Sequence, residues 1–326
     1  MTSVERPLPE HDRIQAVREA SNWSESLLFT AHDSANNVSV WAHWSRIPSR
    51  PHIWEGVLAV YLPDGELLLH RSFGSSADEQ AASTGPLSFT CTAPLEKWTL
   101  SFDGMARRTD TATVTAIPLA DGAWEPVQVS ATFVGSAPTW SARGMESQEW
   151  GDGHLEQPGS ITGSVTFGDL VIPLETAGFR DHSYGPRDYA KVSGDTWVTG
   201  VFPSGRAVLA LQVWTGSEPD APKFAVGFVD DVDGRHPVTA LTLPRLESTD
   251  GGPQTFDAVV VTDKEEILIG IEQTHRSNFT FDSPVGMTLG SRTDADDIVV
   301  TESPARLRWN DEVTDGWVEK TFRFPS

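Results

Sequence analysis

The segments Val38-Ser-Val-Trp-Ala-His-Trp44 and Trp54-Glu-Gly-Val-Leu-Ala-Val-Tyr61 alternate or cluster apolar side chains over short distances. This texture predicts β-strands with a buried face. Comparable runs occupy residues 98–102, 112–117, 127–133, 160–167, 197–202, 207–214, 224–229, 256–262, 267–272, 306–309 and 317–322. Turn residues separate them, including Pro63-Asp64-Gly65, Asp103-Gly104, Asp121-Gly122, Pro203-Ser204-Gly205 and Asp233-Gly234. We therefore predict an all-β fold, with a short helix only at residues 10–21, where Ile14 and Val17 form an apolar stripe.

The number of strands favours closed or sandwiched antiparallel sheets over a parallel α/β core. Most of the 12 tryptophans lie on these strands, where they fill a core, and a subset can line an apolar cavity. The 326 residues suffice for two domains. We expect the halves to meet near residues 168–180, and we place an N-terminal domain at 1–176 and a C-terminal domain at 177–326. An interface between domains is a common place for a ligand site.

The charge balance narrows the range of partners. Lys and Arg total 24 against 46 Asp and Glu, a formal net charge of −22, which disfavours nucleic acid and anionic lipid surfaces. The N-terminus lacks the apolar core of a signal peptide, and no window approaches the roughly 18 apolar residues of a membrane span. We therefore expect a cytoplasmic protein without stable membrane insertion, as a monomer or small homo-oligomer.

Several kinds of site are disfavoured by the sequence. The single cysteine, Cys91, excludes an intramolecular disulfide and a multi-thiolate metal centre, and its alternating surroundings predict a buried, inert thiol. No phosphate loop, dinucleotide fingerprint, zinc-protease helix or nucleophile elbow is present. The run from Asp230 to Gly234 lacks the rest of a calcium loop and favours a hairpin turn. We expect no metal site and no cofactor.

The segment Ala177-Gly-Phe-Arg-Asp-His-Ser-Tyr-Gly-Pro-Arg-Asp-Tyr189 departs from the alternating texture. So many polar groups are costly to bury unless they satisfy one another, so the segment is either a structural network or an active site. On an extended chain Asp181 and His182 face opposite sides. Upstream, His154 and Glu156 are two residues apart, which sets an imidazole beside a carboxylate as an acid–base pair requires. A solvated strand edge is the alternative interpretation of that pair.

The string Gly178-Phe-Arg-Asp-His-Ser-Tyr-Gly-Pro-Arg-Asp188, with His154-Leu-Glu-Gln-Pro158 before it, resembles the tandem lipocalin-like superfamily. That superfamily includes carotenoid hydratases (hydroxyneurosporene synthases), AttH-like proteins, kievitone hydratase and certain fungal Diels–Alderases. The segments 23–29 and 315–319 extend the resemblance over most of the chain. It implies two tandem lipocalin-like (calycin-type) antiparallel β-barrels packed side by side, with a hydrophobic ligand in or between them. Members usually carry a tryptophan where this chain has Tyr184.

In the hydratases of this superfamily an acidic residue is thought to protonate an isolated double bond, and water captures the cation. By this resemblance Asp181 is the expected proton donor, and His182 and Arg187 set its protonation state and orientation. Tyr184 and nearby rings are expected to stabilise positive charge. An ion pair with Arg180 or Arg187 would instead make Asp181 structural. The residues expected to bind substrate are His154, Glu156, Gln157, Arg187, Trp197 and Glu319.

The resulting functional hypothesis is a cofactor-independent enzyme acting on a hydrophobic isoprenoid or polyene-like small molecule. Acid-catalysed hydration or dehydration of a carbon–carbon double bond ranks first. Two alternatives stay open: a non-catalytic carrier of a lipophilic metabolite, and a cyclase or isomerase that works by holding a polyene in a productive shape.

Overall fold

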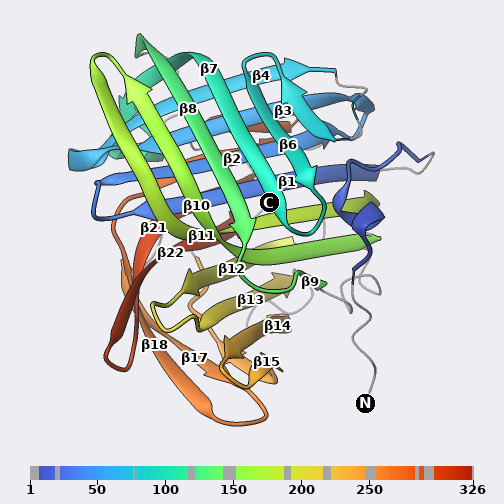
Figure 1. The fold of residues 1–326 in the computed structure, drawn as a ribbon, viewed down its shortest axis with the longest axis vertical. Coiled ribbons are helices and arrows are strands. Elements are labelled where there is room, and N and C mark those ends of the chain that lie inside the picture. Colours follow the sequence, from blue (N-terminus) through green and yellow to red (C-terminus); the bar gives the residue numbers. More distant parts are fainter. Residues whose placement is uncertain are drawn as a thin grey trace.

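The computed structural model describes residues 7–18, 23–75, 78, 80–116, 122–141, 152–186, 192–215, 222–246, 254–282, 286–289 and 297–324. Nearly all of these residues lie in two antiparallel β-sheets, which confirms the predicted all-β class (Figure 1). The helical elements are two 3-10 turns, η1 (Pro9–Asp12) and η2 (Pro63–Gly65), and the α-helix α1 (Thr111–Ala116). None of these helices has the length and hydrophobicity of a membrane-spanning segment.

The first sheet forms a closed barrel. Its strands are β1 (Trp23–Asp33), β2 (Val38–Ile47), β3 (Arg50–Tyr61), β4 (Glu66–Gly74), β5 (Ala81–Thr84), β6 (Leu87–Ala93), β7 (Lys97–Asp110), β8 (Ala123–Gly135), β9 (Trp140–Ser141), β10 (Gly153–Phe167) and β11 (Leu170–Pro186). Eight of them follow the order β4-β3-β2-β1-β11-β10-β8-β7. Pairing of Leu67 and Leu69 in β4 with Thr109 and Arg107 in β7 closes the ring.

The second sheet is a curled half-barrel. Its strands are β12 (Val192–Val201), β13 (Ala207–Thr215), β14 (Pro222–Asp231), β15 (Gly234–Pro237), β16 (Ala240–Thr242), β17 (Thr255–Val261), β18 (Glu266–Gln273), β19 (Ser277–Asp282), β20 (Gly286–Leu289), β21 (Ile298–Trp309) and β22 (Glu312–Arg323). The main path runs β15-β14-β13-β12-β22-β21-β18-β17-β16, and β19 branches from β21. Within the described ranges its edge strands β15 and β16 do not pair with each other, so this half is open where the first is closed.

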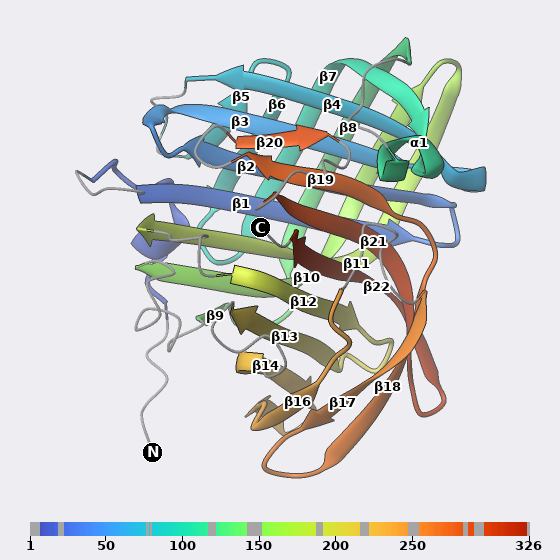
Figure 2. The ribbon, with the colours of Figure 1, turned by 180° about the vertical axis from the view of Figure 1, so that it is seen from behind.

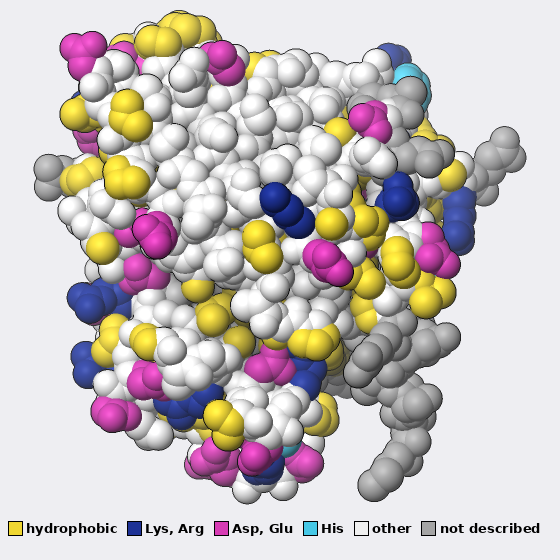
Figure 3. Space-filling view, in the orientation of Figure 1, with side chains coloured by type: hydrophobic (Ala, Val, Ile, Leu, Met, Phe, Trp, Pro, Cys, Tyr) yellow, Lys and Arg dark blue, Asp and Glu magenta, His cyan; other side chains and the backbone are white. Residues whose placement is uncertain are grey.

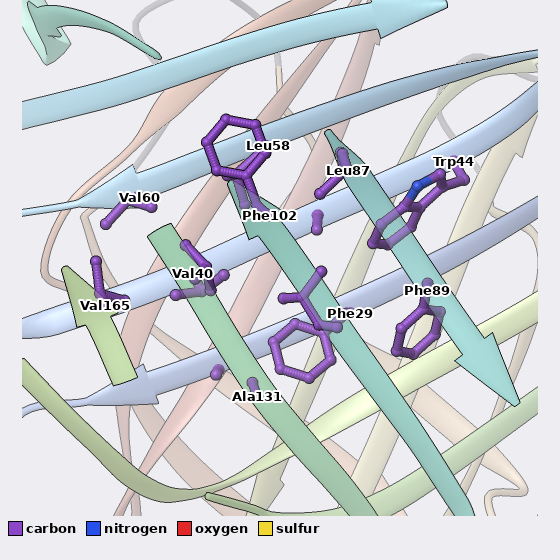
Figure 4. Close-up of a cluster of buried hydrophobic side chains, with 14 of the residues drawn as sticks. Phe29, Val40, Trp44, Leu58, Val60, Leu87, Phe89, Phe102, Ala131 and Val165 are labelled. Atoms are coloured by element: carbon purple, nitrogen blue, oxygen red, sulfur yellow. The ribbon is translucent and has the colours of Figure 1, made fainter. Parts of the chain in front are cut away.

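The interior of the closed barrel is packed with side chains (Figure 4). The ring of Phe89 stacks on Trp44 with centroids 5.1 Å apart and on Trp98 at 4.7 Å. Cys91 belongs to the same core, where burial raises the pKa of its thiol to about 12, consistent with an inert thiol. Core filling therefore accounts for the large rings of this barrel.

A second core joins the outer face of the barrel to the second sheet. All 11 residues of β1 are buried, because one face of the strand points into the barrel and the other toward the second sheet. Trp41 of β2 stacks on Phe279 of β19 with centroids 4.5 Å apart, and Figure 2 shows β19 and β20 lying over this side of the barrel. The two halves thus share a large apolar interface.

The predicted helix at residues 10–21 is wrong over its described part, where only Pro9–Asp12 is helical and residues 14–18 have no regular structure. The reason is tertiary. Asp12 accepts hydrogen bonds from Arg180 Nη1 (2.6 Å) and Trp98 Nε1 (3.0 Å), and Ile14 joins the barrel core. Those contacts favour an extended segment across the barrel end over a local helix.

Two further local predictions are wrong. Residues 111–116 form α1 instead of a strand, because the Asp110 carboxylate accepts a hydrogen bond from the Thr113 N–H (2.8 Å) and caps the helix. Asp103-Gly104 lies inside β7 instead of at a turn, because β7 continues past it from its β6 partner to its β4 partner. The hairpin turn at Asp233-Gly234 is confirmed between β14 and β15, whereas Asp121 and residue 117 lie outside the described residues.

The segment at the expected domain boundary is itself a strand. β11 crosses residues 176 and 177, and its pairing partners, β1 and β10, both belong to the first sheet. The two sheets therefore divide after Pro186, within the region assigned to the second domain.

Asp and Glu side chains are spread over both halves of the molecular face shown in Figure 3.

Candidate functional site

An imidazole and two carboxylates meet on the outer face of the barrel. His154 and Glu156 are two residues apart on β10, and Asp181 of β11 lies directly opposite Glu156 in the strand register. Strand alternation therefore points all three side chains toward the second sheet. His154 Nε2 lies 3.2 Å from Glu156 Oε1 and also contacts Asp181 Oδ2. The predicted pairing of His154 with Glu156 is thus present in the structure.

The carboxylates control the charge of His154. Burial alone lowers the pKa of this imidazole, but Asp181 and Glu156 outweigh burial and raise it to about 10. Burial raises the pKa of Glu156 to about 7, against the opposing effect of His154. Asp181 Oδ2 contacts this imidazole directly.

A second acidic group faces this one from the other sheet. Glu302 of β21 and Glu319 of β22 are direct partners in the strand register, which places their carboxyl groups next to each other on one face of the sheet. Burial, then the neighbouring Glu302, raises the pKa of Glu319 well above its ordinary value, and burial raises that of Glu302 to about 7. Both shifts favour the protonated form of these carboxyl groups.

Indole side chains connect the acidic groups. Trp197 Nε1 of β12 donates to Glu156 Oε1 (3.1 Å) across the interface, and Trp317 Nε1 of β22 donates to Glu302 Oε2 (2.6 Å). Asp195, two residues before Trp197, accepts from Thr321 (2.7 Å), and burial and Glu319 raise its pKa well above its ordinary value. The site therefore combines carboxyl groups from both sheets with aromatic walls.

A small pocket adjoins these walls between the sheets. Its volume of about 10 Å³ has room for about one water molecule, far below the roughly 300 Å³ at the lower end of ligand pockets, so in this conformation it does not hold a small molecule. Phe179 and Trp317 line it. Phe179 packs edge-on against Trp197, with ring centroids 6.2 Å apart, so both aromatic walls of the pocket touch residues of the acidic site.

The site residues predicted from the sequence lie in two groups on opposite faces of β10 and β11. It brings Trp197 and Glu319 together with His154, Glu156 and Asp181. Three others lie on the opposite face of β10 and β11, where they contact the barrel: Gln157 accepts from Arg180 Nη2 (2.7 Å), His182 Nε2 lies 2.9 Å from Glu25 Oε1, and Tyr184 packs on His182. Arg187 lies outside the described residues.

The suspected ion pair between Arg180 and Asp181 is not made. Arg180 points into the barrel and pairs with Asp12, with 2.6 Å between Nη1 and Oδ1. Within the described part of the chain, Asp181 contacts the imidazole of His154. His154, and not His182, is therefore the imidazole that contacts Asp181, because His182 faces Glu25 inside the barrel.

Sequence reasoning missed Asp195, Glu302 and Trp317. A usable signal exists for each, because Asp195 and Trp317 lie two residues from Trp197 and Glu319 and share their faces. Glu302 interrupts the apolar strand Ile298–Trp309 and is 1% exposed. A carboxyl group in the buried part of a strand is expensive, which makes it a candidate functional residue.

Solved structures share this architecture. A protein from Nitrosomonas europaea described as a candidate AttH aligns with 94% of this chain and 97% of its own, at 12% identity and a TM-score of 0.61. CghA aligns with 96% of this chain and 94% of its own, at 10% identity and a TM-score of 0.56. CghA in complex with Sch210972 aligns with 96% and 95%, at 13% identity and a TM-score of 0.58.

These likenesses confirm the resemblance at the level of the fold. Identities this low do not transfer a reaction. A comparison with curated proteins finds no match. The profile described as a domain of unknown function, DUF7064, matches residues 8–322, and the chain therefore belongs to that family.

Proposed function

We propose that this protein is an enzyme that adds water to, or removes water from, an isolated carbon–carbon double bond of a hydrophobic isoprenoid or polyene compound. The observation that carries the proposal is the pair Glu302–Glu319, which are register partners between the two sheets beside tryptophan rings and whose pKa values are raised by burial. Protonating an alkene needs an acid that keeps its proton near neutral pH, and burial beside another carboxyl group supplies this property.

Glu319 is the better proton donor of the two acidic groups proposed from sequence and structure. Asp181 contacts the cationic His154, which favours the ionised carboxylate. Glu319 has carboxyl neighbours instead, and they favour its protonated form. Glu302 accepts from Trp317 and so stabilises the negative charge that develops when Glu319 gives up its proton.

The reaction balances within the chain and the substrate. The Glu319 O–H bond breaks, and its proton forms a C–H bond with the π electrons of the double bond, which leaves a tertiary cation. A water oxygen forms the C–O bond with that cation and then returns a proton to the Glu319 carboxylate. Trp197 and Trp317 stabilise the cation through their ring faces. The surrounding carboxylates stabilise it through their negative charge. Dehydration follows the same steps in reverse.

The fold comparisons support the coarser part of the proposal, a protein that accommodates a small molecule. CghA has the same fold and was crystallised with Sch210972. Phe179 and Trp317 provide an apolar wall between the sheets, and Trp317 reaches the acid pair through its bond to Glu302. A carrier, or a cyclase that acts through shape alone, would use that wall without needing the proton of Glu319.

The experiment is incubation with a panel of prenylated and polyene compounds in D2O, followed by mass spectrometry of the released compounds. We expect one compound to gain the mass of heavy water, with one deuterium on carbon. Glu319→Gln should lower turnover at least 100-fold while ligand binding persists. Glu272→Gln, on the exposed side of β18, is the matched control.

Three outcomes would reject the proposal in different ways. Binding without conversion of any compound favours the carrier. Conversion with neither gain nor loss of water, and without deuterium on carbon, favours the shape-based cyclase. Full turnover in Glu319→Gln removes Glu319 from the chemistry.

A further inference from the structure

His154, Glu156 and Asp181 have the geometry of a metal-binding triad. One possible ligand atom from each residue lies within 4.8 Å of the other two. Two adjacent hydrogen-bonded strands fix these positions, since His154 and Glu156 share a face of β10 and Asp181 is the register partner of Glu156. The convergence is therefore a property of the sheet and does not depend on loop conformation.

A separate observation points to a ligand at this place. Glu156 is 2% exposed, yet its Oε2 atom has no hydrogen-bond partner within the described ranges. An unpaired carboxylate oxygen at this depth is costly unless something binds it. In addition, the single Nε2 atom of His154 contacts carboxylate oxygens of both Glu156 and Asp181, although one N–H points toward only one acceptor at a time.

Neighbouring side chains hydrogen-bond to the carboxylates of Glu156 and Asp181. Trp197 Nε1 donates to the other oxygen of Glu156 at 3.1 Å. Ser183 Oγ donates to Asp181 Oδ1 at 3.4 Å and lies 3.0 Å from Ser26 Oγ. Such outer hydrogen bonds orient metal-binding side chains and are a regular feature of metal sites.

We propose that His154, Glu156 and Asp181 bind one divalent transition-metal ion of the first row through one imidazole nitrogen and two carboxylate oxygens. The mixed nitrogen and oxygen set suits Mn²⁺, Fe²⁺, Co²⁺ or Zn²⁺ better than Ca²⁺. Three protein ligands leave a coordination position for water or for a ligand oxygen. The two negative charges are balanced by the ion. This site goes beyond the proposed function, does not depend on it, and revises the expectation that the protein binds no metal.

The test uses the full chain, stripped with a chelator and titrated with Co²⁺ and with Zn²⁺, without substrate. We expect one ion per chain by elemental analysis, a visible Co²⁺ absorption spectrum with a nitrogen ligand, and displacement of Co²⁺ by Zn²⁺. His154→Gln should weaken binding at least 100-fold. His236→Gln is the matched control, because His236 also lies near two carboxylates, Asp231 and Asp263, but on the surface of the second sheet.

Asp181→Asn provides a second variant, and circular dichroism confirms that each variant is folded. The absence of stoichiometric binding of either ion would overturn the site. Equal affinity in His154→Gln and the parent protein would overturn it as well. Because no substrate is present, neither result bears on the double-bond chemistry proposed for Glu319.

Discussion

Asp181 and His182 are adjacent in the sequence but lie on opposite faces of β11. Asp181 contacts His154 at the interface between the sheets, whereas His182 lies 2.9 Å from Glu25 inside the barrel. Because the barrel core and the interface lie on either side of one strand, the polar segment 178–188 divides into two groups over its described part. One group stabilises the barrel, and the other faces the candidate site.

His182→Phe should affect stability alone. The substitution removes a buried hydrogen bond to Glu25, which keeps Arg46 and the Gln15 N–H as partners. We expect a loss of about 1–3 kcal/mol in the free energy of unfolding, measured by urea denaturation, with Co²⁺ affinity unchanged. His52→Phe, at an exposed position of β3, should change stability little. A loss of Co²⁺ affinity in His182→Phe would contradict the division of β11 into two faces.

Asp12→Asn should be the most destabilising of the polar substitutions considered. It leaves the Arg180 guanidinium, which is 1% exposed, without its ionic partner inside the barrel. Breaking a buried pair in this way costs about 3–5 kcal/mol, which urea denaturation can measure. Arg18→Ala breaks the exposed pair with Asp152 and should cost about 1 kcal/mol or less. Similar costs for the two variants would show that Asp12 does not hold the barrel end.

Glu302→Gln should remove part of the pH dependence of stability. Burial raises the pKa of Glu302 from 4.5 to about 7 in the folded protein. The folded state therefore binds the proton more tightly, and this contribution to stability is full below about pH 4.5 and is lost as the pH rises through about 7. Since glutamine does not ionise, the stability of the variant relative to the parent should increase by roughly 3 kcal/mol from pH 4.5 to 8.

The measurement is urea denaturation of both proteins at several pH values in this window. A difference between the two proteins that stays constant with pH would mean that Glu302 ionises as it does in the unfolded chain. Glu272→Gln, on an exposed strand position, should follow the parent at every pH.

Most strands could be predicted because their signal is local. The alternation in Val38–Trp44 and the turn at Asp233-Gly234 require only neighbouring residues. The strand prediction is wrong at residues 111–116. The run of β-branched residues there favours a strand, but one side chain, Asp110, caps a helix. The helix predicted at residues 10–21 is wrong over its described part. Asp12 and Ile14 contact Arg180 and the barrel core, which are distant in the sequence, and these contacts override local propensity.

The candidate site could be predicted only where its residues are close in the sequence. The pairing of His154 with Glu156 follows from spacing along one strand. The partnership of Glu302 with Glu319 depends on strand register, and the bond from Trp197 to Glu156 depends on how two sheets pack. Neither relationship leaves a local pattern. The role expected for His182 came from the resemblance, and alternation along β11 places this side chain on the other face from Asp181.

The proton held between Glu302 and Glu319 is the central claim, and infrared difference spectroscopy between the parent protein and Glu319→Gln at neutral pH tests it most directly. We predict that the parent shows the carbonyl stretch of a protonated carboxyl group, that this band shifts in D2O, and that it is missing or displaced in Glu319→Gln and Glu302→Gln but unchanged in Glu272→Gln. A parent spectrum in which both groups appear only as carboxylates at neutral pH would contradict the account, because Glu319 would then have no proton to give.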